Sequence, residues 1–347
     1  MNGPAFQNPC GLDGFAFLEF SGPDNTLFHS LFTQLGFACL PEHPHPDIHC
    51  YQQGGIPFIV NGAGDGQPAE HANQHGAGIS AMGFKVADAT HAYRHALKHG
   101  ATPFEDTSSV NHHLLGIEAI GGSVIYFVDD EYQPFQGCWK NARIASTNGL
   151  EAIDHLTHNV QRGNMDKWAD FYARIFNFRE IRYFDIEGKM TGLLSRALAS
   201  PCNKIKIPLN ESKDDKSQIE EFLHAFHGEG IQHVALSTAA IYDTVSHLRR
   251  NGMAFLNVPD TYYEMLGQRL PWHQEPLAAL QQEKILMDGG VTPDDGLLLQ
   301  IFTENLFGPV FFEIIQRKGN EGFGEGNFQA LFEAIERDQI KRGTLSE

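Results

Sequence analysis

Three side chains of the kind that binds metal ions stand in three separate strand-like stretches of the sequence. Glu313 lies inside the short apolar run FFEIIQR. A buried carboxylate is costly unless it is paired or bound to a metal ion. His155, in DHLTHNV, and His233, in GIQHVALS, are the candidate partners. Two histidines and one carboxylate from separate strands are typical of a non-haem Fe(II) site, which keeps coordination positions open.

Each of these residues also has a purely structural interpretation. A lone histidine on a strand is usually buried and hydrogen-bonded without any further role. We keep that interpretation for His158, because residues 155 and 158 of one strand face opposite sides. For Glu313 the alternative is a buried salt bridge with an arginine elsewhere. The metal hypothesis gains its weight from the three residues together.

Length and composition bound the class of protein. The chain has 347 residues, of which 41% are hydrophobic and 20% charged. This is an ordinary globular composition, with enough length for about two domains. The formal net charge of −18 argues against a surface that binds nucleic acid or an anionic membrane.

The cysteines and the first residues of the chain indicate the cellular compartment that we expect. Five scattered cysteines without a CxxC pair are typical of a reducing compartment. The first residues, MNGPAFQNP, show neither the basic nor the apolar region of a signal peptide. No run of about 18 apolar residues predicts a membrane span. We therefore expect a cytoplasmic protein.

The elements that must position the candidate ligands repeat along the chain. Periodicity predicts a strand, a helix and further short strands, given twice in each half of the chain. The leading strands are predicted at residues 15–20, 79–86, 153–160 and 231–237, and the helices that follow them at 25–36, 89–99, 165–176 and 241–251. The fold class is therefore α+β, built of tandem βαβββ modules that form two open, barrel-like domains.

The two halves can be aligned on each other, and the alignment separates their roles. Gly78 matches Gly230 at an offset of 152 residues, and Gly11 matches Gly149 at an offset of 138. With these offsets the first half offers Phe17 for His155 and Ala81 for His233, and a looser match offers Tyr126 for Glu313.

The first half thus keeps the pattern and lacks every proposed ligand. We expect a scaffold domain over residues 1–140 and a catalytic domain over residues 149–347, with the boundary between about Gln133 and Asn148. A glycine-rich segment, residues 319–326, then precedes a predicted helix at residues 327–340. We expect this C-terminal helix to fold back over the active site. The segment is no phosphate loop, because it lacks the Lys-Ser/Thr of that motif.

The sequence resembles the 4-hydroxyphenylpyruvate dioxygenase family over nearly its whole length. The resemblance is carried by DHLTHNV, PLNESKDDKSQIEEFL, GIQHVAL, LLLQIFTEN, FFEIIQR and GFGEGNFQALFEAIERDQ, and in the first half by LGF and YQQGGIPFIVN. It implies the vicinal-oxygen-chelate fold, which agrees with the repeats. It also implies one Fe(II) per chain, bound by His155, His233 and Glu313.

The family resemblance implies a reaction and a pocket. The reaction would be the conversion of 4-hydroxyphenylpyruvate and O2 into homogentisate and CO2, in tyrosine and phenylalanine catabolism, by a homo-oligomer (a dimer or a tetramer). The implied pocket residues are Ser195, Asn210, Gln218, Gln232, Gln300, Phe302, Phe311, Phe323, Asn327 and Phe328. Because the loop between Asn210 and Gln218 is short here, Gln218 is the weakest of these assignments.

Two other functions remain open at this point. The first is 4-hydroxymandelate synthase, which shares the iron, the fold and the substrate but hydroxylates the benzylic carbon. The resemblance places Phe302 where the synthase tends to carry a smaller aliphatic residue, which favours the dioxygenase. The second is a metal-free binding protein of the same fold. The presence of all three ligands in one half argues against it.

Overall fold

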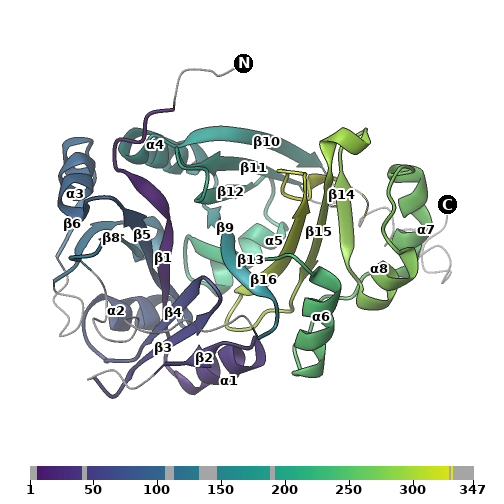
Figure 1. Ribbon diagram of the computed structural model, residues 1–347. Helices are drawn as coiled ribbons and strands as arrows, with labels where there is room; N and C mark the ends of the chain where they lie inside the picture. Colours follow the sequence, from purple (N-terminus) through teal and green to yellow (C-terminus); the bar gives the residue numbers. More distant parts are fainter. Residues whose placement is uncertain are drawn as a thin grey trace.

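The computed structural model describes residues 6–40, 45–105, 113–132, 147–187, 192–327 and residue 330. Two eight-stranded sheets with helices against them make up this part of the chain, one in each half. Figure 1 shows the N-terminal sheet in purple and blue beside the C-terminal sheet in teal, green and yellow. None of the described helices is long and apolar enough to cross a membrane.

The N-terminal sheet has the strand order β2-β3-β4-β1-β5-β8-β7-β6. The pairs β1–β4 and β5–β8 are parallel, whereas β1 and β5 are antiparallel. The strands are β1 (Leu12–Ser21), β2 (Ala38–Cys39), β3 (Ile48–Gln53), β4 (Ile56–Asn61), β5 (Gly78–Val86), β6 (Pro103–Phe104), β7 (Leu115–Glu118) and β8 (Val124–Val128).

The C-terminal sheet repeats this topology strand for strand, in the order β10-β11-β12-β9-β13-β16-β15-β14. Here β9–β12 and β13–β16 are parallel and β9–β13 is antiparallel. The strands are β9 (Leu150–Val160), β10 (Arg179–Glu187), β11 (Gly192–Ala199), β12 (Lys206–Ser212), β13 (Gly230–Thr238), β14 (Leu286–Gly289), β15 (Leu297–Phe302) and β16 (Phe311–Lys318).

Eight α-helices and two 3-10 turns connect the strands in the described part of the chain. The amphipathic helix α4 (Met165–Phe176) buries the apolar stripe that the sequence predicted, with Trp168, Tyr172 and Ile175 inside. The remaining helical elements are α1 (Thr26–Gln34), α2 (Gly66–His75), α3 (Ala89–Lys98), α5 (Gln218–Ala225), α6 (Ile241–Arg250), α7 (Asp260–Arg269), α8 (Leu277–Glu283), η1 (Ile120–Gly122) and η2 (Pro293–Asp295).

Strand register confirms the internal alignment residue by residue. Phe17 pairs with Gly83 between β1 and β5, as His155 pairs with Ala235 between β9 and β13. Further along the same sheets, Gly83 pairs with Tyr126 and Ala235 pairs with Glu313. Phe17 and Tyr126 therefore occupy the positions that His155 and Glu313 hold in the other half. Ala81 likewise takes the position of His233.

The sequence also predicts a helix that begins at Gln218, which is α5. Three described helices have no counterpart in the sequence-based predictions: α2, α7 and α8. The sequence does not predict helix α2, because its buried residues include Gln67, His71 and His75 and its inner face therefore lacks apolar periodicity. Only residues 327 and 330 of the predicted C-terminal helix are described, and both are helical. The rest of that prediction, and residues 133–146 of the expected domain boundary, lie outside the described residues.

The two halves share one continuous apolar core. Phe20 of β1 meets Phe307 edge-on with ring centroids 5.9 Å apart, and Phe58 of β4 stacks on Phe312 of β16 at 6.1 Å. All four side chains are buried. Residue 312 directly precedes Glu313, so the N-terminal half packs against the back of the strand that carries the candidate ligand.

Candidate metal centre

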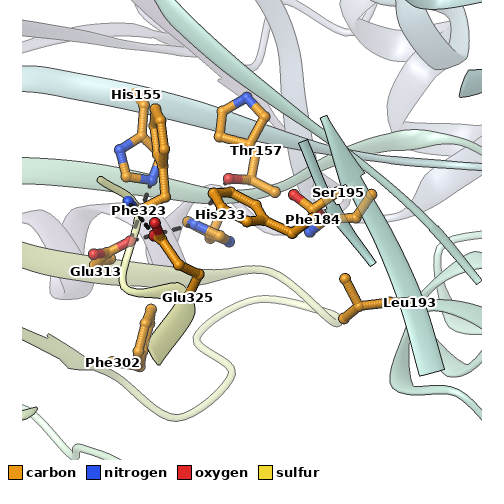
Figure 2. Close-up of a pocket in the computed structure, with 12 residues that line it drawn as sticks. His155, Thr157, Phe184, Leu193, Ser195, His233, Phe302, Glu313, Phe323 and Glu325 are labelled. Atoms are coloured by element: carbon orange, nitrogen blue, oxygen red, sulfur yellow. Dashed lines mark hydrogen bonds and ion pairs between the residues drawn. The ribbon is translucent and has the colours of Figure 1, made fainter. Parts of the chain in front are cut away.

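The three candidate ligands come together at the centre of the C-terminal sheet. His155 on β9, His233 on β13 and Glu313 on β16 offer ligand atoms that all lie within 4.8 Å of one another. Glu313 Oε2 is 3.2 Å from His155 Nε2 and 3.4 Å from His233 Nε2. Figure 2 shows the three side chains converging. All three are buried, which makes an uncompensated charge costly here.

Neighbouring residues hold each imidazole in one orientation. Asp154 Oδ1 lies 2.8 Å from Nδ1 of His155, and Gln232 Oε1 lies 3.1 Å from Nδ1 of His233. Both acceptors favour the tautomer with the proton on Nδ1, so each Nε2 is turned to the centre with its lone pair. Such outer partners fix the orientation of metal-binding histidines and raise their basicity.

The charges of the triad depend on one another. Burial opposes ionisation of Glu313, but the two histidines outweigh it and lower the pKa of that carboxyl. Burial also lowers the pKa of His233. For His155 burial acts in the same direction, yet the carboxylates of Glu313 and Asp154 overcome it and raise its pKa. The two carboxylates thus favour the charged form of His155, whereas burial favours the neutral form of His233.

The donor set fits a divalent metal ion. Two imidazole nitrogens and a carboxylate oxygen face one point, and Glu313 Oε1 is buried without a hydrogen-bond partner. Among the described residues, the ion-pair partners of Glu313 are the two histidines, so the alternative of a salt bridge with an arginine finds no support there. A cation at this point would compensate the carboxylate and complete its contacts.

A pocket opens beside the triad. The three ligands form part of its wall, together with Thr157, Phe184, Leu193, Ser195, Pro208, Asn210, Phe302, Phe323 and Glu325. Besides the ligands, the lining combines five aromatic or aliphatic side chains with four polar ones (Figure 2). An apolar pocket with a few converging polar groups is what small-molecule sites have in common.

Comparison with known proteins adds the family. Residues 6–139 match the family model described as hydroxyphenylpyruvate dioxygenase, N-terminal, and residues 152–269 match that of the glyoxalase, bleomycin resistance protein and dioxygenase superfamily. A 4-hydroxyphenylpyruvate dioxygenase of Legionella pneumophila is 67% identical, over 98% of this chain and 99% of the relative. The chain belongs to the 4-hydroxyphenylpyruvate dioxygenase family.

A second relative and a solved structure are also similar to this chain. The 4-hydroxyphenylpyruvate dioxygenase of Pseudomonas aeruginosa is 50% identical over 98% of both chains. A mutant 4-hydroxymandelate synthase from Streptomyces coelicolor superposes with a TM-score of 0.80, at 24% identity, over 95% of this chain and 99% of that one. The superposition shows the same vicinal-oxygen-chelate fold.

The pocket residues that the family resemblance predicted take different places. Ser195, Asn210, Phe302 and Phe323 line the pocket. Phe311 stacks on the ring of His233 with centroids 4.9 Å apart, so it supports the ligand from the side.

The other five predicted residues contribute indirectly, stand apart or lie outside the described residues. Gln300 Oε1 accepts a hydrogen bond from Asn327 Nδ2 at 3.2 Å, and Gln232 contacts His233 as described above. Gln218 is exposed as the first residue of α5 and is not among the residues that line the pocket. Phe328 lies outside the described residues.

Several residues of the site were missed from the sequence, and one of them had left a signal. Thr157 follows His155 by two positions on the same strand, so the period of two already placed it on the ligand face. Its Oγ1 lies 2.9 Å from Nε2 of His233. Glu325 and Phe184 gave no comparable signal. His158 has the structural role expected of it, because its Nε2 lies 2.8 Å from the hydroxyl of Tyr172.

Proposed function

We propose that this chain converts 4-hydroxyphenylpyruvate and O2 into homogentisate and CO2, with one Fe(II) held by His155, His233 and Glu313. The observation that carries the proposal is the buried triad at the wall of an aromatic pocket, in a chain of this family. Two histidines and one carboxylate are the ligand set of non-haem iron oxygenases. When bound, Fe(II) supplies Lewis-acid binding of the keto acid and activation of oxygen.

The chain's own residues orient the substrate. Ser195 and Asn210 face each other across β11 and β12 and offer polar groups in the pocket wall. Phe302 and Phe323 border the same space with aromatic rings that suit the ring of the substrate. These apolar side chains shield the reacting carbons from water. Fixing the ring relative to the keto acid is the largest contribution that such residues make.

The proposal includes the organisation of the chain. Residues 1–140 would serve as a scaffold domain and residues 149–347 as the catalytic domain. Support comes from the register of β1, β5 and β8, which places Phe17, Ala81 and Tyr126 where the other half has ligands. We also propose a cytoplasmic, homo-oligomeric protein, as the family resemblance implies.

Product analysis is the direct test. The purified chain, freed of metal and reconstituted with Fe(II), is supplied with 4-hydroxyphenylpyruvate and oxygen, and products are separated by chromatography. We expect homogentisate and CO2, in amounts that depend on added Fe(II). If 4-hydroxymandelate were the sole product, the chain would act as a synthase. If no product formed and no metal bound, a metal-free binding protein would be the better account.

A further inference from the structure

A largely buried ion pair stands directly behind one ligand of the triad. Arg317, on β16, contacts Asp154, on β9, through two parallel hydrogen bonds of 2.8 Å, from Nε to Oδ2 and from Nη2 to Oδ1. This two-point arrangement is the strongest that an arginine and a carboxylate form. Burial alone would raise the pKa of Asp154, but Arg317 and His155 lower it, so the carboxylate stays ionised.

The same aspartate contacts the metal site. Oδ1 of Asp154 accepts both from Arg317 and from Nδ1 of His155. Arg317 thereby fixes the carboxylate, and the carboxylate fixes the tautomer and ring plane of the ligand. In the N-terminal half, the internal alignment places Ala16 and Asp130 at the equivalent positions. The pair therefore accompanies the ligands and is not a requirement of the repeated fold.

The guanidinium nitrogen of Arg317 that does not contact Asp154 binds the segment that follows β16. Nη1 of Arg317 donates to the backbone carbonyls of Asn320, at 3.1 Å, and Gly322, at 2.7 Å. Its guanidinium lies 5.5 Å from the ring of Phe323, which in turn meets His155 edge-on at 5.2 Å. The Arg317 guanidinium thus contacts the loop of residues 319–327 directly and the candidate ligand His155 through Asp154.

This 319–327 loop closes the pocket. Phe323 and Glu325 are part of the pocket wall, where only about 50 Å³ is accessible to water. That space admits a few water molecules, whereas ligand pockets usually measure about 300–1,000 Å³. A shift of Phe323 and Glu325 would enlarge this space for an aromatic keto acid, and one of the carbonyls that Arg317 binds, that of Gly322, lies directly before Phe323.

We propose that Arg317 and Asp154 couple the position of the 319–327 loop to the orientation of the metal ligand His155. Both are positioning residues, since neither contacts the reacting atoms. A bound metal ion holds His155 with Nδ1 directed at Asp154, which stabilises the ion pair and with it the closed loop. Such coupling is reciprocal. Closing the loop therefore tightens metal binding, and opening it loosens the ligand.

The test compares three variants with the parent chain, all freed of metal. Asp154→Asn keeps the shape of the side chain and removes its charge. Arg317→Lys keeps the charge and removes the two-point contact. Lys318→Gln is the matched control, because Lys318 is the next residue on β16 and pairs with Glu275, away from Asp154. Circular dichroism checks that each chain is folded.

Two readouts apart from activity are recorded on each chain. Anaerobic titration with Co(II), followed by its visible absorption, gives the metal affinity. Hydrogen exchange with mass spectrometry, with and without Co(II), reports protection of the amides of residues 319–327. We expect Asp154→Asn to weaken Co(II) binding about 10- to 100-fold, as the loss of outer partners generally does. Co(II) should slow exchange of the loop in the parent and not in this variant.

Arg317→Lys should fall between the parent and Asp154→Asn, and Lys318→Gln should match the parent. Unchanged affinity or unchanged loop protection in both Asp154→Asn and Arg317→Lys would overturn the coupling, as would an equal loss in Lys318→Gln. The inference rests on the proposed metal-binding function. The parent titration separates the two: a parent that binds no Co(II) contradicts the metal site itself, whereas a parent that binds beside unaffected variants contradicts only the coupling.

Discussion

The two halves of the chain share one topology and use its centre in opposite ways. In the C-terminal half the inner positions of β9, β13 and β16 carry a buried triad of candidate metal ligands. In the N-terminal half Phe17 and Tyr126 stack with centroids 6.2 Å apart at the equivalent positions. Gly83 leaves space for this packing, since a Cβ there would lie 2.3 Å from the ring of Phe17. The same three positions of the fold can therefore hold either candidate metal ligands or a packed aromatic core, depending on three side chains.

Helices α2 and α5 occupy equivalent positions in the two halves, and here the N-terminal half has the more polar buried face. Helix α5 buries Ile219, Phe222 and Leu223, an ordinary apolar face. Helix α2 instead buries polar and titratable side chains, among them His71 and His75. The half that lacks the candidate ligands therefore has a helix whose buried face is polar and includes titratable side chains.

The largest expected effect comes from removing the carboxylate that distinguishes the two halves. Glu313→Ala should lower Fe(II)-dependent turnover more than about a hundredfold, because loss of an outer partner alone typically costs 10–100-fold. Tyr126→Phe, at the mirrored position, is the control and should retain turnover. Steady-state kinetics and metal analysis measure both. Full turnover with bound iron in Glu313→Ala would contradict the assignment.

Removing the aromatic core of the other half should affect stability instead of chemistry. Phe17 is almost fully buried. Phe17→Ala should lower the free energy of unfolding by about 3–5 kcal/mol, as truncation of a buried Phe usually does. Denaturant unfolding measures this, and Co(II) titration at low temperature should give the parent's stoichiometry. A lost metal site in a folded Phe17→Ala chain would show that the halves are not separate in role.

Acid should affect the polar helix α2 through His71. Burial and the neighbouring His75 lower the pKa of His71 to about 3, below its ordinary value of 6.5. As the pH falls, His71 is protonated in the unfolded chain before it is protonated in the folded chain. The free energy of unfolding that His71 contributes above pH 6.5 is therefore lost as the pH falls towards 3. From pH 7 to pH 5 this one group should cost roughly 1–2 kcal/mol.

His71→Leu should therefore reduce the loss of unfolding free energy between pH 7 and pH 5 by that amount. Urea unfolding at both pH values measures it. His158 keeps a loss of the same sign in both chains, since burial also lowers its pKa to about 3. His247→Gln, at an exposed helix position, is the control. An identical pH dependence in His71→Leu and the parent would refute the prediction.

The smallest change concerns selectivity within the pocket. Phe302 meets His233 edge-on with centroids 6.3 Å apart and borders the pocket. Phe302→Val should let the substrate ring swing aside and divert part of the product from homogentisate to 4-hydroxymandelate, since displacements of about 1 Å can change rates by about a hundredfold. Chromatography detects the products. A lower melting temperature with homogentisate alone would show that Phe302 only fills space.

Much of the fold and the triad could be predicted from the sequence, because both leave periodic signals. Predicted and observed bounds agree for α4, and those of β5 differ by one residue. The offset between the halves gave the register at Phe17 and His155, since the strands of both sheets pair alike. Glu313 was conspicuous as a carboxylate inside an apolar strand, where a charge needs compensation.

The parts that could not be predicted depend on contacts between distant segments. A regular strand would turn Gln232 to the face opposite His233, but the register shifts between Ile231 and His233. The approach of Arg317 to Asp154 joins residues 163 positions apart. Glu325 reaches the pocket at the end of a glycine-rich segment without periodicity, and Gln218, which the family resemblance implied, is not among the residues that line this pocket.

The stacking of Phe58 on Phe312 has a consequence for recombining members of this family. A chimaera that joins the first half of one relative to the second half of another replaces the surface behind the strand that carries Glu313. The crossover would succeed only where the donor supplies a ring of similar size at position 58. Exchange of whole halves is thus a route to altered catalysts in which no pocket residue has been changed.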